Sequence, residues 1–574
     1  MIGFTKNALE IISQRYLLKD AQGMAIETPK QLFERVAKCV AVVEKEDFML
    51  WKQRFYKLMS NFYFLPNSPT LMNAGTRDGQ LSACFVLPVE DSLNGIFTSL
   101  KNAALIHQSG GGTGFNFSKL RPKGSWIDAS GGTSSGPLAF IKIFDVATEY
   151  VKQGGKRRGA NMGILNVDHP DIEEFITSKS NSDAIKNFNL SVGITDAFML
   201  AVQENKDWKL LDPASKEVRK TVKAAYLWQE IVNQAWNSGD PGLIFLDTIN
   251  KHNPLPKSGE IQSTNPCGEV PLLDYESCNL GSINLSKMIK IVNGISSIDW
   301  EKLAETTRLA IRFLDNIIDA NYYILPEIEQ ITKAHRKIGL GVMGWAEMLL
   351  LLKIPYASTK ALLLAEELIK FIQGHSYKSS HDLAIEKGEF PEFRKSSHPQ
   401  TFLLRNATCN SIAPTGSIAV IADASYSIEP LFALAYKRVG ILNGITQTEI
   451  NTPFINTMKQ EKLWNKTLNE EVLKKGSVQH IKGVPEELKH LFRTSLEIPW
   501  KYHLLHQKAF QKFTDNAVSK TINLPENTTP ETISDIYMNA WKYQLKGITI
   551  YRYGSKPGQV LQKCGPDTNL SCDI

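Results

Sequence analysis

The sequence has few of the residues that build disulfide or zinc scaffolds. It contains seven cysteines in 574 residues, and no two of them form a Cys-x-x-Cys pair. This is too few thiols for a disulfide framework and gives no sign of a structural zinc site. Any pairing of cysteines is therefore expected to serve catalytic redox chemistry rather than structural cross-linking.

Long apolar runs and targeting signals are also absent. No run of about 18 apolar residues, the length of a membrane-spanning helix, is present. Residues 1–7 lack the basic region, apolar stretch and cleavage site of a signal peptide, so we expect a cytoplasmic protein. The formal net charge is only +6 over the whole chain. This weakly favours anionic ligands and gives no reason to expect a nucleic-acid or membrane partner.

The composition, with 43% hydrophobic and 22% charged residues, is that of an ordinary globular protein. A helix is predicted after residue 28, where Thr28 is an N-cap, Pro29 takes the first helical position and Gln31 completes a capping box. Cys39 falls within this helix and is expected to be a small buried hydrophobic residue. Further helices are predicted at residues 300–323, 360–371 and 502–519.

Short apolar stretches ending in glycine or proline lie between the predicted helices. Residues 416–422 and 547–551 are examples, and we interpret such stretches as strands. Strands alternating with helices over most of the chain indicate an α/β fold with parallel pairing. No internal repeat or low-complexity linker is apparent, and only the last dozen or so residues resemble a loose tail.

The most informative segment is residues 265–269, which read Asn-Pro-Cys-Gly-Glu. If this segment is extended, alternation places the side chains of Asn265, Cys267 and Glu269 on one face. An amide, a thiol and a carboxylate would then form a small reaction centre. Two further thiols, Cys84 and Cys278, stand in their own short motifs.

Three loops have the composition needed to hold an anion. Residues 413–417 offer two hydroxyls and backbone N–H groups, although such strings often form plain turns. The glycine-rich residues 108–114 would let the backbone approach a ligand closely, but they match neither the dinucleotide nor the Walker pattern. Residues 152–161 combine four cations with glycines, and form either an exposed basic turn or a loop that wraps an anion.

Taken together, these motifs resemble those of a ribonucleotide reductase catalytic subunit, most closely the class II, adenosylcobalamin-dependent type. The resemblance covers nearly the whole chain. It rests on residues 15–20, 66–75, 81–85, 152–161, 265–282, 339–345, 413–417 and 547–553.

The resemblance implies an α/β fold in which a ten-stranded barrel of two five-stranded halves surrounds a central finger loop. A mainly helical region without an ATP-cone is expected at residues 1–65. The barrel is expected at residues 66–555, and a flexible tail carrying a dithiol at residues 556–574. It also implies a homodimer, because effectors of this family bind at a dimer face.

The resemblance also implies a role for each residue of the reaction centre in supplying DNA precursors. Cys267 would carry a thiyl radical that abstracts the ribose 3′-hydrogen. Glu269 would accept the 3′-hydroxyl proton, and Asn265 would hold the ribose hydroxyls. Cys84 and Cys278 would protonate the leaving 2′-hydroxyl, supply two electrons and end as a disulfide.

The remaining expected ligands also follow from the resemblance. The substrate is a ribonucleoside di- or triphosphate, and no metal is expected on side chains. The residues expected to bind substrate are Ser68, Ala83, Gly112, Pro414, Thr415, Gly416 and Ser417. Those expected to bind or relay a dNTP or ATP effector are Asp145, Gln153, Lys156, Arg157 and Arg158.

Three further cysteines have separate expectations. Cys564 and Cys572 resemble a tail dithiol that passes electrons from a thioredoxin or glutaredoxin-like protein to the barrel. Their Cys-x7-Cys spacing is wider than the close pair usual in the family. Cys409 is expected to be a packing residue.

Alternatives to the class II interpretation remain open at this stage. A class I subunit would have two adjacent tyrosines near the end of the barrel, whereas Arg552 separates Tyr551 from Tyr553 here. A glycyl-radical enzyme would need a glycine such as Gly554, but the flanking residues fit that motif poorly. A non-catalytic nucleotide sensor on the same barrel would be expected to have lost its thiols. The absence of an Asp-x-His-x-x-Gly cobalamin motif decides little, because class II enzymes are not expected to use it.

Overall fold

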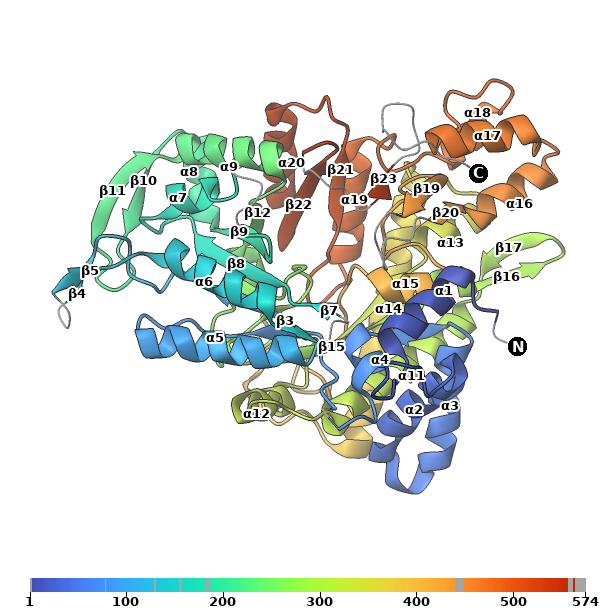
Figure 1. Ribbon diagram of the computed structural model, residues 1–574, viewed down its shortest axis with the longest axis horizontal. Helices are drawn as coiled ribbons and strands as arrows, with labels where there is room; N and C mark the ends of the chain where they lie inside the picture. The colour runs from blue at the N-terminus through green and yellow to red at the C-terminus, as the bar shows by residue number, and fades with distance from the viewer. Residues whose placement is uncertain are drawn as a thin grey trace.

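The computed structural model describes residues 3–77, 79–127, 131–153, 157–180, 185–438, 447–555 and 561–562. A strongly curved sheet lies at the centre, with helices around it and the N-terminal helices packed at one side (Figure 1). Among the described residues, no helix is both long and apolar enough to cross a membrane.

The first half of the barrel consists of parallel strands that pair in the order β2, β3, β8, β9, β12. Most of their residues are buried, as expected for a parallel sheet that is covered on both faces. Their bounds are Cys84–Val86 (β2), Gly112–Asn116 (β3), Asn161–Asn166 (β8), Phe188–Ile194 (β9) and Gly242–Phe245 (β12).

The second half is also parallel and is closed partly by short bridges. β15 (Ser277–Asn284) pairs with β18 (Ile338–Met343), and β21 (Thr521–Leu524) pairs with β22 (Gly547–Arg552). Between β18 and β21, parallel bridges join Leu340 to Asn410 and Ile412 to Val518.

The two halves meet where β2 and β12 pair antiparallel with β15 and β22, and β1 (Phe64–Pro66) also pairs with β15. This arrangement confirms the expected α/β barrel of two parallel halves.

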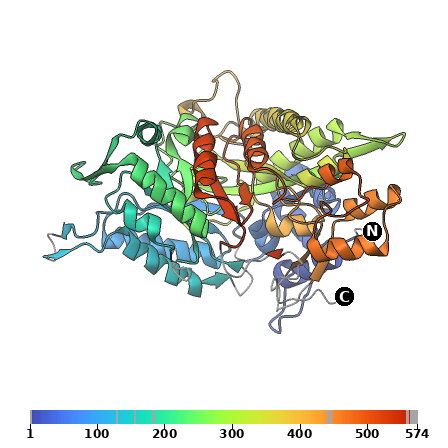
Figure 2. The same ribbon diagram turned by 90° about the horizontal axis from the view of Figure 1, so that it is seen from above.

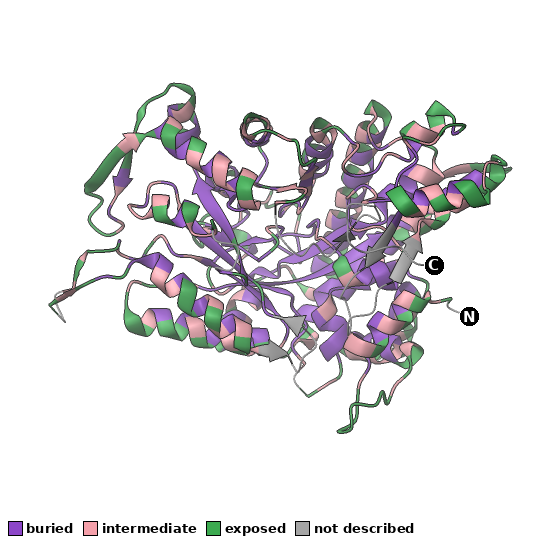
Figure 3. Cartoon of the chain, turned by 45° about the horizontal axis from the view of Figure 1, so that its top comes forward, coloured by how far each residue is buried: buried purple, intermediate pink, exposed green. Residues whose placement is uncertain are grey.

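Helices cover the outside of the barrel, and seen from above the central strands lie between helices on either side (Figure 2). The burial pattern follows this arrangement, with buried strands and helices that are exposed on their outer faces (Figure 3). The helices around the first half are α5 (Leu93–Gln108), α6 (Pro137–Tyr150), α7 (Ile172–Thr177), α8 (Asp196–Gln203), α9 (Ala224–Ser238) and α10 (Leu246–Lys251). Those around the second half are α11 (Trp300–Ala320), α12 (Pro326–His335), α13 (Trp345–Leu351), α14 (Thr359–Lys387), α15 (Gly416–Ile421), α19 (Trp500–Gln511) and α20 (Pro530–Lys542).

The N-terminal helices confirm one prediction in detail. α2 (Pro29–Ala41) begins with the predicted capping box, in which the Thr28 hydroxyl accepts from the Gln31 backbone N–H and the Gln31 side-chain oxygen accepts from the Thr28 backbone N–H. Cys39 lies in α2 but is only half-buried. The other elements of this region are α1 (Lys6–Ile11), a π-helix (Ile12–Tyr16), a 3-10 helix (Val42–Asp47), α3 (Phe48–Ser60) and α4 (Ser68–Asn73).

Smaller elements project from the barrel. An excursion after α15 contains α16 (Thr452–Gln460), α17 (Lys466–Lys475) and α18 (Glu486–Leu491), and 3-10 turns occupy Leu285–Lys287 and Phe393–Lys395. The remaining strands are β4 (Trp126–Ile127), β5 (Gly132–Thr133), β6 (Lys152–Gln153), β7 (Arg157–Arg158), β10 (Asp207–Leu211), β11 (Val218–Lys223), β13 (Ser263–Thr264), β14 (Pro271–Leu272), β16 (Ile289–Val292), β17 (Ile295–Ile298), β19 (Ala435–Arg438), β20 (Gln447–Ile450) and β23 (Leu561–Gln562).

Some predicted elements differ from the observed ones. Residues 416–422 were expected to form a strand, but Gly416–Ile421 form the short helix α15, because a brief apolar run alone does not distinguish the two structures. α19 ends at Gln511, whereas the prediction extended to residue 519, because the chain there turns back into the barrel at the bridge to Val518. α14 is much longer than predicted, while α11 and β22 agree closely.

A buried ion cluster attaches the N-terminal helices to the barrel. The carboxylate of Glu44 accepts from Arg312 at 2.6 and 2.7 Å, from Asn316 at 2.7 Å and from Lys387 at 3.0 Å. Burial of Glu44 opposes ionisation, but these hydrogen bonds outweigh it and lower the pKa of the carboxyl to about 2. The cluster therefore joins the segment after α2 to α11 and α14.

Candidate active site

The segment that carries Cys267 is a tight turn at the tip of a hairpin. β13 and β14 pair antiparallel and enclose residues 265–270. The Gly268 N–H donates to the Asn265 carbonyl at 3.0 Å, and Gly268 has a φ of +81°. A backbone that turns in this way is not extended, so the expected strand-like alternation of side chains at residues 265–269 is wrong. The Cys267 side chain is nevertheless exposed at the tip.

Close backbone contacts fix this finger loop inside the barrel. A Cβ atom on Gly114 of β3 would lie 1.8 Å from the carbonyl oxygen of Thr264, so only glycine permits this approach. The Asn189 amide donates to the Pro266 carbonyl at 2.7 Å. The glycine-rich residues 108–114 were expected to approach a ligand closely. Gly111 and Gly112 line the pocket described below, and Gly114 admits the finger loop.

The Glu269 end of the loop is held by the second half of the barrel. The carbonyl of Glu269 accepts from the Ala517 N–H and from the Ser411 hydroxyl, both at 2.8 Å. The Glu269 side chain is buried. The tip and the end of the finger loop are therefore attached to opposite halves of the barrel.

Cys84 and Cys278 lie directly across from each other on β2 and β15. Both are thiols and both are buried, with 3% and 0% of their surfaces exposed. The side-chain amide of Asn265 donates to the Cys84 sulfur at 3.1 Å. The finger loop is thus in contact with the thiol pair.

The environment of Cys278 keeps its proton in place. Burial raises the pKa of the Cys278 thiol well above its usual range, and Lys337 only partly opposes this shift. Lys337 donates to Glu276 at 2.7 Å, and His335 contacts the other oxygen of the same carboxylate at 2.5 Å. Burial raises the pKa of Glu276, but Lys337 and His335 outweigh burial and lower it. At neutral pH Cys278 is therefore a protonated thiol beside a buried charge cluster.

The expected phosphate loop at residues 413–417 leads into α15. Thr415 has a φ of +63° and its hydroxyl accepts from the Ser427 N–H at 2.8 Å. Arg15, from the N-terminal region, donates to the Ser417 hydroxyl at 3.0 Å. The hydroxyls of Tyr16 and Ser68 lie 2.8 Å apart. The N-terminal helices and the barrel together form this part of the site.

A pocket of about 300 Å³ joins the finger loop, the thiol strand and the phosphate loop. It brings together the expected catalytic residues Asn265, Cys267, Glu269 and Cys84, while Cys278 does not line it and is the strand partner of Cys84. Every residue expected to bind substrate lines it: Ser68, Ala83, Gly112, Pro414, Thr415, Gly416 and Ser417.

The residues expected to bind an effector are only partly described. The carboxylate of Asp145 on α6 accepts from the Asn187 N–H at 2.7 Å. Gln153 lies in β6, and Arg157 and Arg158 form β7, the strand that pairs with β6. Lys156 and the tail cysteines Cys564 and Cys572 lie outside the described residues.

Two other expectations concern cysteines and metals. Cys409, expected to be a packing residue, is fully buried in the core. Within the described parts of the chain, no group of three His, Cys, Asp or Glu side chains is arranged to hold a metal ion.

Several residues of the site were not found from the sequence. Arg15 and Tyr16 line the pocket, and Asn67 lies beside them. Asn189 holds the finger loop from β9. Arg15 and Tyr16 stand in one of the family-like segments, but no spacing or composition there indicates contact with a loop some 400 residues away in the sequence.

Comparisons with family models and with individual proteins identify the same family. The chain matches the models for "Ribonucleotide reductase, barrel domain" at residues 82–404 and 400–551, and "Ribonucleotide reductase, all-alpha domain" at residues 2–79. It is 46% identical to a vitamin B12-dependent ribonucleoside-diphosphate reductase of Thermoplasma acidophilum, over 97% of this chain and 80% of that protein. A protein of the same description from Mycobacterium tuberculosis is 46% identical over 98% of this chain and 81% of its own length.

More distant relatives agree. The ribonucleoside-diphosphate reductase large subunit of Danio rerio is 30% identical over 95% of this chain and 75% of that protein. The solved alpha subunit of the Actinobacillus ureae class Id ribonucleotide reductase superposes with a TM-score of 0.78 at 23% identity, covering 96% of this chain and 97% of that one, and so shares its fold. The chain belongs to the ribonucleotide reductase large-subunit family.

Proposed function

We propose that this protein is an adenosylcobalamin-dependent ribonucleotide reductase that converts ribonucleoside diphosphates to 2′-deoxyribonucleotides for DNA synthesis. The observation that carries the proposal is a single pocket lined by the exposed thiol Cys267, the carboxylate Glu269 and the buried thiol Cys84, with Cys278 directly across from Cys84 on the neighbouring strand. The 46% identity to two vitamin B12-dependent ribonucleoside-diphosphate reductases supports the cofactor and the diphosphate substrate.

The reaction divides between the two sides of the pocket. Cys267, as a thiyl radical, removes the hydrogen from ribose C3′, and Glu269 accepts the 3′-hydroxyl proton. The 2′-hydroxyl then leaves as water after protonation by the Cys84 and Cys278 pair. Two electrons pass from this pair to the substrate radical as the pair becomes a disulfide. Cys267 then returns its hydrogen to C3′ of the product radical and becomes a thiyl radical again.

The surroundings of the thiol pair support this division. Cys278 has a raised pKa because it is buried, so it carries a proton at neutral pH and can give it to a leaving hydroxyl. Cys84 and Cys278 are strand partners, and closely apposed cysteines are what a disulfide requires. Asn265 contacts the Cys84 sulfur and is able to hold a ribose hydroxyl next to it.

The tip of the finger loop has room for a radical-generating cofactor. Cys267 is exposed, and a Cβ built on Gly268 would have no atom within 4 Å. Cys267 and Gly268 are the residues that we expect adenosylcobalamin to contact. When bound, it supplies the organic radical that this chemistry needs.

Arg15 and the phosphate loop are proposed to bind the substrate diphosphate. Arg15 lines the pocket beside the phosphate loop, and its hydrogen bond to the Ser417 hydroxyl orients its guanidinium. A guanidinium is suited to phosphate because its N–H groups match two oxygens at once. The N-terminal region therefore contributes directly to substrate binding in this proposal.

The proposal includes a homodimer that is regulated by dNTP or ATP. The helices α5 and α6 carry large apolar side chains that are strongly exposed, as expected of a surface that pairs with another subunit. These are Leu93, Phe97, Leu105, Ile143, Val146 and Tyr150. Asp145 lies on the same helix α6 and is proposed to contact the effector, whose identity residues 153–158 would relay to the substrate. We also propose that a thioredoxin or glutaredoxin-like protein reduces the enzyme and that the protein is cytoplasmic.

The deciding experiment mixes purified protein with a ribonucleotide, adenosylcobalamin and dithiothreitol, and measures 2′-deoxyribonucleotide by chromatography. We expect product from the diphosphate, and a much lower kcat/KM with the corresponding triphosphate. Product that appears only when a separate metal-bearing subunit is added would refute the cobalamin-dependent assignment. Adding each dNTP in turn should change the ratio of the four reduction rates, and an unchanged ratio would refute the proposed effector site.

A further inference from the structure

A second pocket, of about 440 Å³, lies at the other end of the barrel from the reaction centre. Thr408 lines this pocket and Pro414 lines the first one, and the short strand that contains Asn410 and Ile412 runs between them. The size is within the range of about 300–1,000 Å³ that is typical of small-molecule sites. No step of the proposed reaction uses this pocket.

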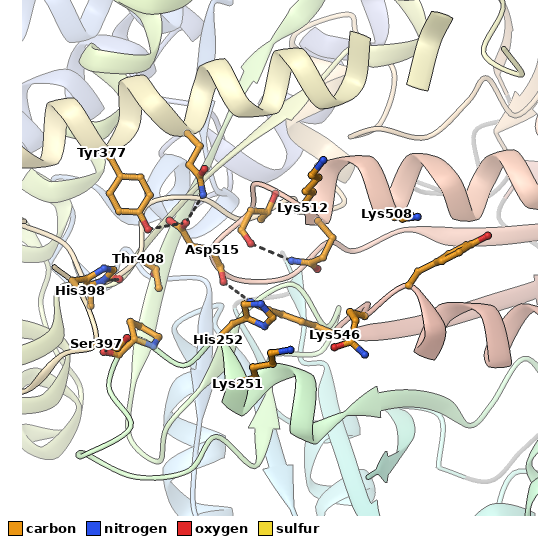
Figure 4. Close-up of a pocket in the computed structure, with 17 residues that line it drawn as sticks. Lys251, His252, Tyr377, Ser397, His398, Thr408, Lys508, Lys512, Asp515 and Lys546 are labelled. Atoms are coloured by element: carbon orange, nitrogen blue, oxygen red, sulfur yellow. Dashed lines mark hydrogen bonds between the residues drawn. The ribbon is translucent and has the colours of Figure 1, made fainter. Parts of the chain in front are cut away.

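The side chains of this pocket are mostly cationic. Four lysines line it: Lys251 at the end of α10, Lys508 on α19, Lys512 directly after α19, and Lys546 just before β22 (Figure 4). His252 and His398 add two imidazoles. Each of these histidines uses one ring nitrogen on a backbone carbonyl at 2.8 Å, and among the described residues its other ring nitrogen has no hydrogen-bond partner.

Asp515 is the single carboxylate among the residues that line the pocket, and its oxygens are already used. One accepts from the amide of Gln373 and the hydroxyl of Tyr377, at 3.1 and 3.0 Å. The other accepts from the N–H groups of Cys409 and Asn410, at 2.8 and 3.1 Å. Asp515 therefore holds neighbouring strands together and does not pair with any of the lysines, so the pocket keeps an excess of positive charge.

Lys546 is the buried cation of the pocket, with 6% of its surface exposed. Its ammonium donates to the carbonyls of Asp515 and Asn516, at 2.5 and 2.7 Å. Burial lowers the pKa of Lys546 to about 8, although Asp515 opposes the shift. A bound anion would favour the charged form and so recover part of the cost of burying it.

The other lysines are held near the opening by weaker contacts. The Lys508 ammonium lies 4.3 Å from the centre of the Tyr543 ring, and Lys512 forms an ion pair with Glu366. Both lysines are exposed, so they can turn toward a ligand at little cost. Lysine ammonium groups act as point charges that suit phosphate oxygens. A ligand with a single carboxylate would neutralise only one of the four lysines, whereas a ligand with a chain of phosphates would neutralise several.

We propose that this pocket binds a polyphosphate group, either inorganic or as the phosphate chain of a nucleotide. The pocket is also connected to the reaction centre through the barrel wall. Lys546 holds the Asn516 carbonyl, and the next residue, Ala517, donates to the carbonyl of Glu269. The peptide unit between Asn516 and Ala517 therefore links Lys546 to the main chain of Glu269, the residue that carries the proposed general base.

The test measures the acetylation rate of each lysine of the full-length protein by peptide mass spectrometry. Sodium tripolyphosphate, ATP and adenosine are the three probes. At a tripolyphosphate concentration ten times its dissociation constant, we expect labelling of Lys251, Lys508 and Lys512 to slow about tenfold. Lys474 and Lys475, exposed on α17, serve as controls and should be labelled at an unchanged rate. No protection, or equal protection of the control lysines, would overturn the proposal.

The probes also separate the two sources of phosphate. Equal protection by tripolyphosphate and ATP assigns the pocket to the phosphate chain alone, whereas protection by ATP at a much lower concentration assigns it to a nucleotide. Protection by adenosine equal to that by ATP would contradict phosphate recognition.

A double variant provides a second test. Lys508→Gln with Lys512→Gln changes only exposed side chains. It should raise the tripolyphosphate concentration needed to protect Lys251 about tenfold. Lys474→Gln with Lys475→Gln is the matched control. Unchanged protection of Lys251 in the first variant would overturn the proposal. Because the readout is local labelling, its result does not depend on whether the protein reduces ribonucleotides.

Discussion

Cys84 and Cys278 occupy opposite positions on the antiparallel pair β2 and β15, at one of the two junctions where the halves of the barrel meet. The pair is buried, whereas Cys267 on the finger loop is exposed. This separation predicts different failures when the three thiols are changed one at a time.

Cys267→Ser should lower kcat about 1,000-fold or more, because an alcohol O–H bond is too strong to be converted to the required radical. Cys84→Ser and Cys278→Ser should still start the reaction but release decomposed substrate instead of deoxyribonucleotide. Product and free base are measured by chromatography after a single turnover, with Cys39→Ser as the control. Normal product formation by Cys278→Ser with thioredoxin as reductant would end the proposed assignment.

The tail cysteines should affect only repeated turnover. Cys564→Ser or Cys572→Ser, starting from the prereduced enzyme, should give one equivalent of product and then stop when thioredoxin is the reductant. Dithiothreitol should restore turnover, because a small dithiol can reach the barrel directly. A loss of the first equivalent of product would mean that these residues act inside the pocket.

Gly114→Ala should damage catalysis through the position of the finger loop. The new methyl group would overlap the Thr264 carbonyl, so the loop that carries Cys267 must move. A shift of about 1 Å costs roughly 100-fold in rate when reacting groups must be aligned. The kcat of this variant is compared with that of Gly374→Ala, where a Cβ would meet no atom within 4 Å. Equal values of kcat would show that the loop tolerates displacement.

Arg15→Ala should raise the KM for a ribonucleoside diphosphate about tenfold, since one charge-assisted contact to phosphate is lost. Arg15→Lys should recover part of this loss, because it keeps the charge but not the paired N–H groups. Lys19→Ala changes an exposed cation nearby and is the matched control. If Arg15→Ala leaves KM unchanged and lowers only kcat, Arg15 has another role.

Glu44 should make stability depend on pH in the acid range. Its pKa is lowered from 4.5 to about 2 on folding, so its contribution is complete above pH 4.5 and is lost as the pH falls toward 2. Glu44→Gln should therefore lower the free energy of unfolding by roughly 3 kcal/mol at pH 7. The difference from the unchanged protein should shrink below pH 4 in urea titrations. A constant difference from pH 7 to pH 3 would contradict this assignment.

The sequence predicted the parts of this protein that depend on local pattern. The capping box at Thr28 placed the start of α2, and the apolar run at residues 547–551 placed β22. The motifs around Cys84, Cys267 and Cys278 indicated three thiols; the barrel places Cys84 and Cys267 on one pocket, and Cys278 directly across from Cys84.

What the sequence did not predict depends on contacts between distant segments or on backbone geometry. The bond from Arg15 to Ser417 joins residues that share no local pattern. The turn at Gly268 was not expected, because alternation of polar side chains does not distinguish a strand from a tight loop. The helix α15 was interpreted as a strand for the same reason. The lysines of the second pocket come from three separate segments, so no single stretch of sequence indicates them.

The Glu269 carbonyl, which accepts from both Ser411 and Ala517, has a further consequence for engineering. Ser411 and Ala517 belong to neighbouring strands of the barrel wall, near the bridges that complete its second half. The finger loop therefore connects two neighbouring segments of the barrel wall in addition to presenting Cys267. Shortening the loop, or transplanting it into another barrel, would remove a support from the scaffold together with the reactive group, so the chemistry and the architecture of this enzyme cannot be redesigned independently at this point.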